Sequence, residues 1–393
     1  MSSITSVLRS RASGLVPTPA ARLCIAADVF GSMSLAEIKR LARVHTAAIC
    51  SLSIDVVQQR YLLSAGADKS IQLFDLESPS RARHGTRQIE SSRCIAAGGG
   101  HTSLVSSVEW YPIDSGMFSS ASFDHTLRVW DTSTMAEVCQ FDLGSRIYCQ
   151  KMSLTGAHAL IAVASESPYI RLCDLRTGAS SQQLQAHRGG GTVAAWSPIQ
   201  PYILATGGND GKLKLWDIRQ ARSHIGDFGH SMDGSPCAHS SGLNGLLFTN
   251  DGEGLISSGS DQHIRVWSIE SPPSAMGDFP STGAGIYGAT GISEMATTTA
   301  ADGTSGSDVL FRPCGDTTVS VASPSTGQQL ALLDGHFAAT HCAAWRSNSK
   351  ELYTAGADSN IIIWSIPARE ELSRDQEELR ADSWSDSEPQ DAP

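Results

Sequence analysis

Short apolar runs alternate with turns rich in Gly, Asn and Asp along most of the chain. The clearest case spans residues 202–217, where an apolar run at 202–206 leads into the turn Asn-Asp-Gly at 209–211. A second apolar run follows at 213–217 and ends in Trp-Asp. Two extended runs on either side of a tight turn of this type predict a β-hairpin.

This hairpin pattern recurs with fixed spacing. Each copy has a His before the hairpin, a Ser or Thr in the first strand, an Asp in the turn and an aromatic residue six positions after that Asp. The His and the Asp are 22 or 23 positions apart in every copy. The five sets are His45, Ser64, Asp68 and Phe74; His101, Ser120, Asp124 and Trp130; His187, Thr206, Asp210 and Trp216; His239, Ser257, Asp261 and Trp267; and His336, Thr354, Asp358 and Trp364.

A repeat of roughly 40 to 50 residues with these markers resembles the WD40 β-propeller, which has four strands per blade. The gaps between clear copies are long enough for two further blades, at residues 146–176 and 284–322. In the first, Cys173 replaces the Trp, and the second has lost both His and Trp. We therefore predict an all-β, seven-bladed WD40 propeller over residues 44–367 as one closed domain.

The repeated His, Ser/Thr and Asp are also the residue types of a catalytic triad. A triad occurs once in a chain, however, whereas this set occurs five times with its hydroxyl inside a strand. The resemblance implies a structural relay in each blade, from Asp to His to hydroxyl to indole. We expect no enzyme activity, no cofactor and no metal site.

Outside the predicted ring, residues 1–43 carry apolar positions at Leu23, Leu35, Ile38 and Leu41. The stretch 34–37, Ser-Leu-Ala-Glu, has the form of a capping box and predicts a helix over about 35–43. Residues 1–27 contain three Arg and no acid, as in a mitochondrial transit peptide. Because the amphipathic pattern continues past any cleavage site, we expect a short N-terminal helical docking arm.

The remaining segments differ in composition from the blades. Residues 78–88 are basic and polar and predict a solvated loop between blades, with contact to an acidic partner as the alternative. Residues 268–308 are rich in Gly, Ser and Thr, and we expect part of this stretch to be a mobile excursion. Residues 368–393 hold nine acids and three Arg, which predicts an acidic disordered tail. Trp384 within this tail leaves a short linear binding motif as an alternative.

Charge and cysteine content narrow the function classes. The net charge of −11 and the absence of a basic stripe argue against a nonspecific nucleic-acid binder, and we expect no direct sequence-specific nucleic-acid binding either. The nine Cys include no CxxC pair, which fits a reducing compartment without a zinc site or disulfide framework. No apolar run is long enough to span a membrane.

Two arginines carry the functional signal. Arg219 follows the Trp-Asp of one blade by two positions, at Asp217-x-Arg219, and Arg176 stands in the matching place of the preceding blade. This pattern resembles WD-repeat substrate receptors of cullin-4 RING ubiquitin ligases, in which such arginines bind the adaptor DNA damage-binding protein 1. Further likeness to the Cockayne syndrome A family lies in residues 60–77, 108–131, 196–206, 332–336, 351–353 and 381–387.

That resemblance implies a nuclear substrate receptor in transcription-coupled nucleotide excision repair. Its partners would be the adaptor, the cullin-4 RING ligase, the Cockayne syndrome B remodeller and the RNA polymerase II complex. Adaptor binding would fall to Arg176, Asp217 and Arg219 and, by position only, to Leu23, Leu35, Ile38 and Leu41. A WD40 scaffold of a histone- or chromatin-modifying complex is the alternative.

Overall fold

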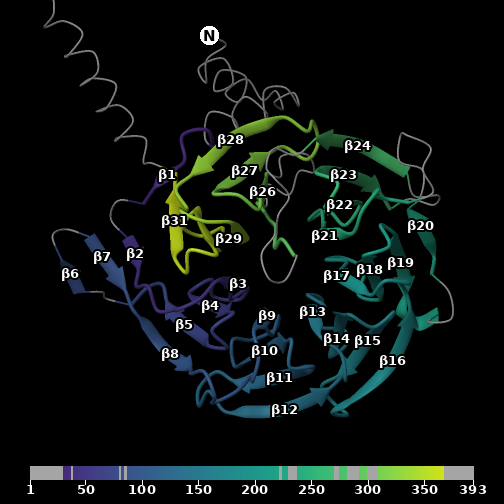
Figure 1. Cartoon of the computed structure of the whole chain (residues 1–393), viewed down its shortest axis with the longest axis horizontal. Helices are drawn as coiled ribbons and strands as arrows, with labels where there is room; N and C mark the ends of the chain where they lie inside the picture. The colour runs from purple at the N-terminus through teal and green to yellow at the C-terminus, as the bar shows by residue number, and fades with distance from the viewer. Residues whose placement is uncertain are drawn as a thin grey trace, which may run out of the picture.

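The computed structural model describes residues 30–36, 39–78, 81–83, 86–220, 224–228, 237–269, 274–280, 292–298 and 309–366. Within these ranges, seven four-stranded antiparallel sheets stand around a common centre, with one strand of each near the axis and one at the periphery (Figure 1). The predicted seven-bladed propeller is confirmed, including the two weaker blades.

Blades 1 to 3 follow the chain from the inner strand to the outer strand. Blade 1 consists of β3 (Ile49–Ile54), β4 (Tyr61–Gly66), β5 (Ile71–Asp75) and β8 (Ser91–Ile95). Blade 2 consists of β9 (Val105–Trp110), β10 (Met117–Ser122), β11 (Thr126–Asp131) and β12 (Glu137–Asp142). Blade 3 consists of β13 (Ile147–Met152), β14 (Leu160–Ser165), β15 (Tyr169–Asp174) and β16 (Ala179–Gln185).

Blades 4 to 6 keep the same order. Blade 4 consists of β17 (Gly191–Trp196), β18 (Ile203–Gly208), β19 (Leu213–Asp217) and β20 (Gly226–Phe228), with a 3-10 turn η1 (Ile218–Gln220). Blade 5 consists of β21 (Leu243–Phe248), β22 (Gly254–Gly259), β23 (His263–Ser268) and β24 (Ser274–Pro280). Blade 6 consists of β25 (Ala296–Thr297), β26 (Leu310–Pro313), β27 (Thr318–Ala322) and β28 (Gln329–Asp334).

Blade 7 joins the two ends of the described chain. Its first three strands are β29 (Thr340–Arg346), β30 (Glu351–Gly356) and β31 (Ile361–Ser365), and its outer strand is β1 (Ser34–Leu35). Leu35 pairs with Trp364, and the Ala36 N–H donates to the Ile363 carbonyl at 2.9 Å. The ring therefore takes its closing strand from the segment that the sequence assigns to a separate arm.

The helix predicted over residues 35–43 is wrong. The described parts of this stretch are extended, as β1 and as β2 (Lys39–Leu41). The capping pattern is a local signal, whereas the edge of β31 offers backbone hydrogen bonds that a helix could not accept, and tertiary pairing outweighs local propensity here.

The basic insertion at 78–88 also differs from the expected solvated loop. It contains β6 (Arg81–Arg83) and part of β7 (Thr86–Ile89), which form a hairpin. β7 pairs in parallel with β2, so that the insertion and the N-terminal segment share a three-stranded sheet beside blade 1 (Figure 1). Leu41 and Ile89 of this sheet pack into the seam between blades 7 and 1.

Each blade buries both faces against its neighbours, and the apolar core is therefore divided into seams between blades. The largest cluster runs through blades 3 to 5 and contains Trp196, Trp216 and Trp267, all buried. Sheets that close into a ring in this way leave few exposed strand edges.

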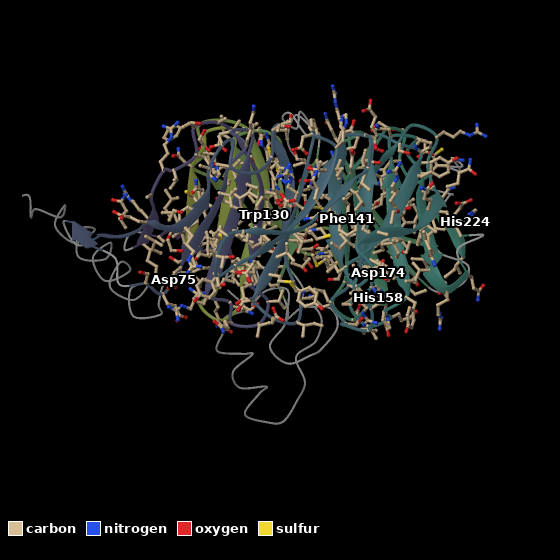
Figure 2. All side chains as sticks on the ribbon, turned by 90° about the horizontal axis from the view of Figure 1, so that it is seen from below. Asp75, Trp130, Phe141, His158, Asp174 and His224 are labelled. Atoms are coloured by element: carbon tan, nitrogen blue, oxygen red, sulfur yellow. The ribbon has the colours of Figure 1, made fainter. Side chains whose placement is uncertain are left out.

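The ring has two faces. On one, called the histidine face, lie the turns between second and third strands, with the repeated Asp. On the other lie the ends of the third strands, because β19 runs antiparallel to β18 and Asp217 pairs with Ile203 at its start. We call this second side the Asp-x-Arg face. Figure 2 shows Asp75 and Asp174, which close the third strands of blades 1 and 3, near the same rim.

Candidate functional site

The repeated polar residues form a hydrogen-bonded relay inside each strong blade. In blade 4, His187 lies 3.0 Å from Asp210 through Nδ1 and 3.0 Å from the Thr206 hydroxyl through Nε2. The Trp216 indole N–H donates to the same hydroxyl at 2.9 Å. One polar chain thus ties the loop before the blade to its second and third strands.

The other four sets have the same geometry. The distance from His Nε2 to the hydroxyl is 2.7 Å in blades 1 and 2 and 2.8 Å in blades 5 and 7. An indole N–H completes the relay at 2.8 or 2.9 Å in blades 2, 5 and 7 through Trp130, Trp267 and Trp364. Blade 1 has Phe74 in that position, and its relay therefore ends at Ser64.

The relay residues are too enclosed to act on a substrate. The hydroxyls of Ser64, Ser120, Thr206, Ser257 and Thr354 belong to residues that are 0% exposed. Burial by itself raises the pKa of a turn carboxylate, but hydrogen bonds from the His and from backbone N–H groups outweigh it, and the pKa values of Asp68 and Asp210 fall to about 2. The carboxylates are ionised and permanently paired, which suits a structural role.

Blades 3 and 6 lack this relay. In blade 3, Cys173 occupies the Trp position and is fully buried in an apolar cluster, without a His–Asp pair beside it. In blade 6, the Asp316 carboxylate accepts from the backbone N–H and the hydroxyl of Thr318 in its own turn, and no His lies beside it among the described residues. Backbone pairing and apolar packing hold these two blades, together with isolated side-chain bonds such as that from Arg171 to the Leu143 carbonyl.

Arg219 is an exposed side chain of the Asp-x-Arg face that is held by two partners. Its Nε and Nη2 donate to the two oxygens of Asp217 at 2.9 and 2.7 Å, in a bidentate pair. The guanidinium carbon lies 4.8 Å from the ring centre of Tyr202. The Arg219 side chain is still 63% exposed, against 9% for Asp217. A rigid, exposed guanidinium with free N–H groups suits recognition of another protein.

Arg176 is held differently. Its backbone N–H donates to Asp174 at 2.9 Å, but its side chain has no recorded hydrogen bond or ion pair with the described residues. The residue that precedes the second strand of blade 3 is Ala159, where blade 4 has Tyr202. The two arginines therefore lie on one rim of adjacent blades, and only Arg219 has an aromatic support.

Two of the four apolar positions expected to dock a partner lie in the described residues, where Leu35 and Leu41 line one hollow beside β31. Leu35 is 48% exposed on β1, and Leu41 packs into the seam between blades 7 and 1. Leu23 and Ile38 lie outside the described residues. Leu35 is therefore the more exposed of the two, and Leu41 is half-buried.

A row of exposed aliphatic side chains also marks the Asp-x-Arg face, and the sequence reasoning missed it. It comes from the loop between first and second strands in four consecutive blades. Its members, which we call the aliphatic arc, are 51% to 59% exposed and are Val56, Val57, Ile113, Leu154 and Ile199.

The aliphatic arc does not continue into blades 5 and 7, where the corresponding loops are polar. The matching loops of blades 5 and 7 read Thr-Asn-Asp-Gly-Glu at 249–253 and Ser-Asn-Ser-Lys at 347–350. The signal for the arc was present in the sequence as one or two aliphatic residues per loop. The sequence does not show that these loops lie on the same face of the ring, so the arc becomes visible only in the folded structure. Clustered apolar exposure of this kind marks protein-interaction surfaces.

The inner strands carry a charged group that the sequence did not indicate. Lys151 Nζ on β13 lies 3.8 Å from a carboxylate oxygen of Glu109 on β9. Glu294 accepts from the Ser51 hydroxyl at 2.9 Å and from the Leu52 N–H at 3.1 Å, so that it links blade 6 to blade 1. Burial, and then the charge of Glu294, raise the pKa of Glu109 to about 7 against the pull of Lys151.

The structure gives no support to a metal centre or a membrane segment in the regions that it describes. No three His, Cys, Asp or Glu side chains come together there as a metal site. None of the described segments is a helix long and apolar enough to cross a bilayer.

Four segments match the family model described as WD domain, G-beta repeat, at residues 92–131, 178–217, 232–268 and 327–365. They end at the third strands of blades 2, 4, 5 and 7. These are the four blades whose relay is completed by a Trp, so the sequence family and the hydrogen-bond geometry identify the same repeats.

Several curated proteins are similar to this chain. WD repeat-containing protein ATCSA-1 of Arabidopsis thaliana is 30% identical over 90% of this chain and 94% of its own length. A ribosome biogenesis protein WDR12 homolog of Chlamydomonas reinhardtii is 31% identical, over 49% of this chain and 44% of its own length. Radiation-sensitive protein 28 of Saccharomyces cerevisiae is 26% identical, over 42% of this chain and 38% of its own length. Of these three, the alignment extends around the whole ring for ATCSA-1.

Proposed function

The chain belongs to the WD-repeat family that includes ATCSA-1, and from that premise we propose that it is the substrate-recognition subunit of a cullin-4 RING ubiquitin ligase. In this proposal it acts in the nucleus, in transcription-coupled nucleotide excision repair. It bridges the adaptor DNA damage-binding protein 1 to substrates at stalled RNA polymerase II, among them a partner like the Cockayne syndrome B remodeller.

The observation that carries this proposal is the exposed guanidinium of Arg219, held bidentately by the buried Asp217, on the same face as the aliphatic arc. Association between proteins draws most of its affinity from a few apolar and Arg side chains that become buried, and charge pairs at the edge fix orientation. The Asp-x-Arg face offers both on blades 1 to 4. Ubiquitin transfer belongs to the partner ligase in this account.

The test is capture of purified adaptor by the full chain. We expect Arg219→Ala to weaken binding by roughly 10- to 100-fold, because it removes the rigid guanidinium. Arg176→Ala should weaken it less, because the Arg176 side chain is not held in place. Arg188→Ala is the matched control, since Arg188 follows the relay His187 on the histidine face. Circular dichroism should show that every variant is folded.

Wild-type chain that never captures the adaptor would overturn the proposal. A histone or chromatin scaffold would then be the better account, since that role uses the same fold without an Asp-x-Arg interface. Equal loss in the Arg188 and Arg219 variants would also count against it, because the effect would then follow lost positive charge anywhere on the ring.

A further inference from the structure

The support beneath Arg219 extends into the neighbouring blade. Tyr202, on which the guanidinium lies, directly precedes β18 in blade 4. His158 stands in the corresponding loop of blade 3, just before β14, and its ring centre is 5.8 Å from that of Tyr202. Figure 2 shows His158 near the same rim as Asp174. Two blades therefore contribute to the surroundings of one arginine.

His158 is fixed in orientation by three further contacts. Its Nε2 lies 2.6 Å from the carbonyl of Pro201, the residue before Tyr202. The Leu160 N–H points to its Nδ1 at 3.3 Å. Its ring centre is 4.8 Å from that of Trp196, whose indole N–H donates to the Lys151 carbonyl. Because a carbonyl can only accept, Nε2 carries the proton and Nδ1 accepts from Leu160.

We propose that His158 is a positioning residue that holds Pro201 and Tyr202 in place and so orients Arg219 toward a carboxylate on the adaptor. The identity of the partner rests on the proposed function, whereas the effect of His158 on Arg219 rests on contacts within this chain. His158 reaches across the seam between blades 3 and 4, where a loop of either blade alone could shift. The chain is Trp196 to His158, His158 to Tyr202, and Tyr202 to Arg219.

The acceptor chemistry follows from the N–H groups that remain on Arg219. Asp217 takes Nε and one Nη2 hydrogen, which leaves the Nη1 edge of the guanidinium without a recorded partner among the described residues. The Tyr202 ring keeps the guanidinium plane from rotating freely. A planar donor pair held in one orientation matches a carboxylate, and holding it before contact lowers the entropy cost of binding.

Blade 1 shows the end of a third strand that has no Asp-x-Arg arginine, because Glu77 stands two positions after Asp75. There Arg60 occupies the position of Tyr202 in the strand register, and it donates directly to Asp75 at 2.8 and 2.6 Å. The carboxylate at the end of the third strand again accepts two hydrogen bonds from an arginine. In blade 1 this arginine precedes the second strand, whereas in blade 4 it follows the third strand. An Asp at this position can therefore be satisfied without a His and a Tyr beside it, which fits a role of His158 and Tyr202 in positioning Arg219.

The first test needs no partner. The full chain labelled with 15N reports the Arg219 Nε–Hε group by NMR, assigned from its loss in Arg219→Lys. We expect His158→Ala to lower the heteronuclear NOE of this group, as the side chain becomes mobile. His158→Gln should retain most of it, because the Gln amide nitrogen can replace Nε2 as donor to Pro201. Unchanged Arg219 signals in a folded His158→Ala variant would overturn the proposal.

The second test uses adaptor affinity. We expect His158→Ala to weaken binding about tenfold and His158→Gln to weaken it less than threefold, on the order of a single positioned hydrogen bond. The double variant His158→Ala/Arg219→Ala should bind no more weakly than Arg219→Ala alone if His158 acts through Arg219. Additive losses would contradict this route. If the wild-type chain does not bind the adaptor, the proposed function fails, and the NMR result still decides the role of His158.

Discussion

The fold places the Glu109 carboxyl group where its ionised form is disfavoured. It lies on the inner strand of blade 2, its charge is opposed by burial and by Glu294, and its pKa rises from the ordinary 4.5 to about 7. The folded state therefore binds a proton more tightly than the unfolded chain. Its contribution to stability is greatest below about pH 4.5 and is lost as the pH rises through 7.

We expect Glu109→Gln to stabilise the protein at pH 8 by roughly 1–3 kcal/mol and to have little effect at pH 4.5, because the neutral amide removes the cost of ionisation. Urea unfolding at both pH values measures this difference. Glu137→Gln is the control, since Glu137 is on the outer strand of blade 2 and pairs with Arg128 near solvent. A variant that is destabilised at pH 8 but unaffected at pH 4.5 would show that the ion pair with Lys151 outweighs the burial of charge.

At the scale of the blade, we expect the hydrogen-bonded relay to make the five blades that contain it more stable than blades 3 and 6. Removing the shared hydroxyl of blade 4 by Thr206→Val leaves His187 Nε2 and the Trp216 indole N–H buried without a partner, and we expect a loss of roughly 2–4 kcal/mol. Urea unfolding checks it, and Thr192→Val offers a comparison, because that hydroxyl bonds only to backbone carbonyls. A smaller loss for Thr206 than for Thr192 would contradict a special role of the relay.

The same reasoning ranks the blades that have no relay. We expect the amide hydrogens of β14 and β27, in blades 3 and 6, to exchange at least about tenfold faster than those of β18 in blade 4. Hydrogen exchange followed by mass spectrometry of peptides from each blade measures this in one experiment. Uniform protection around the ring would mean that seam packing, and not the relay, limits local opening.

The spacing of His, hydroxyl, Asp and Trp predicted five blades, because each relay lies within about 30 residues of sequence and repeats itself. Blades 3 and 6 followed from gap length alone. The outer strand β1 could not be predicted in this way, since its partner Trp364 lies at the far end of the chain and the local pattern at Ser34 indicates a helix. The site divides likewise. Arg219 and Asp217 are two positions apart in the sequence, whereas His158 and Tyr202 belong to different blades and meet only in the folded ring.

At the scale of the whole molecule, the ring is closed by residues that precede the first blade. Phe30 lies 6.0 Å from both Phe311 in blade 6 and Trp345 in blade 7, by ring centres, and Met33 is 8% exposed in the same cluster. β1 then adds backbone pairing along β31. In a closed ring every blade needs both neighbours, so a weakness at this join affects all seven.

We therefore expect a chain that begins at residue 37 to unfold at a temperature several degrees below one that begins at residue 30, since burial of Phe30 and Met33 contributes roughly 2–4 kcal/mol. Both truncated chains lack residues 1–29, so the comparison isolates the closing strand and its two apolar anchors. Scanning calorimetry gives the two midpoints. Equal midpoints would mean that β1 adds nothing to closure, and the ring would then be held by the seam between blades 7 and 1 alone. A lower midpoint for the chain that begins at residue 37 would mean that deleting the N-terminal segment destabilises the ring. Adaptor-binding assays on N-terminally deleted chains should then retain residues 30–36, so that lost binding is not caused by unfolding.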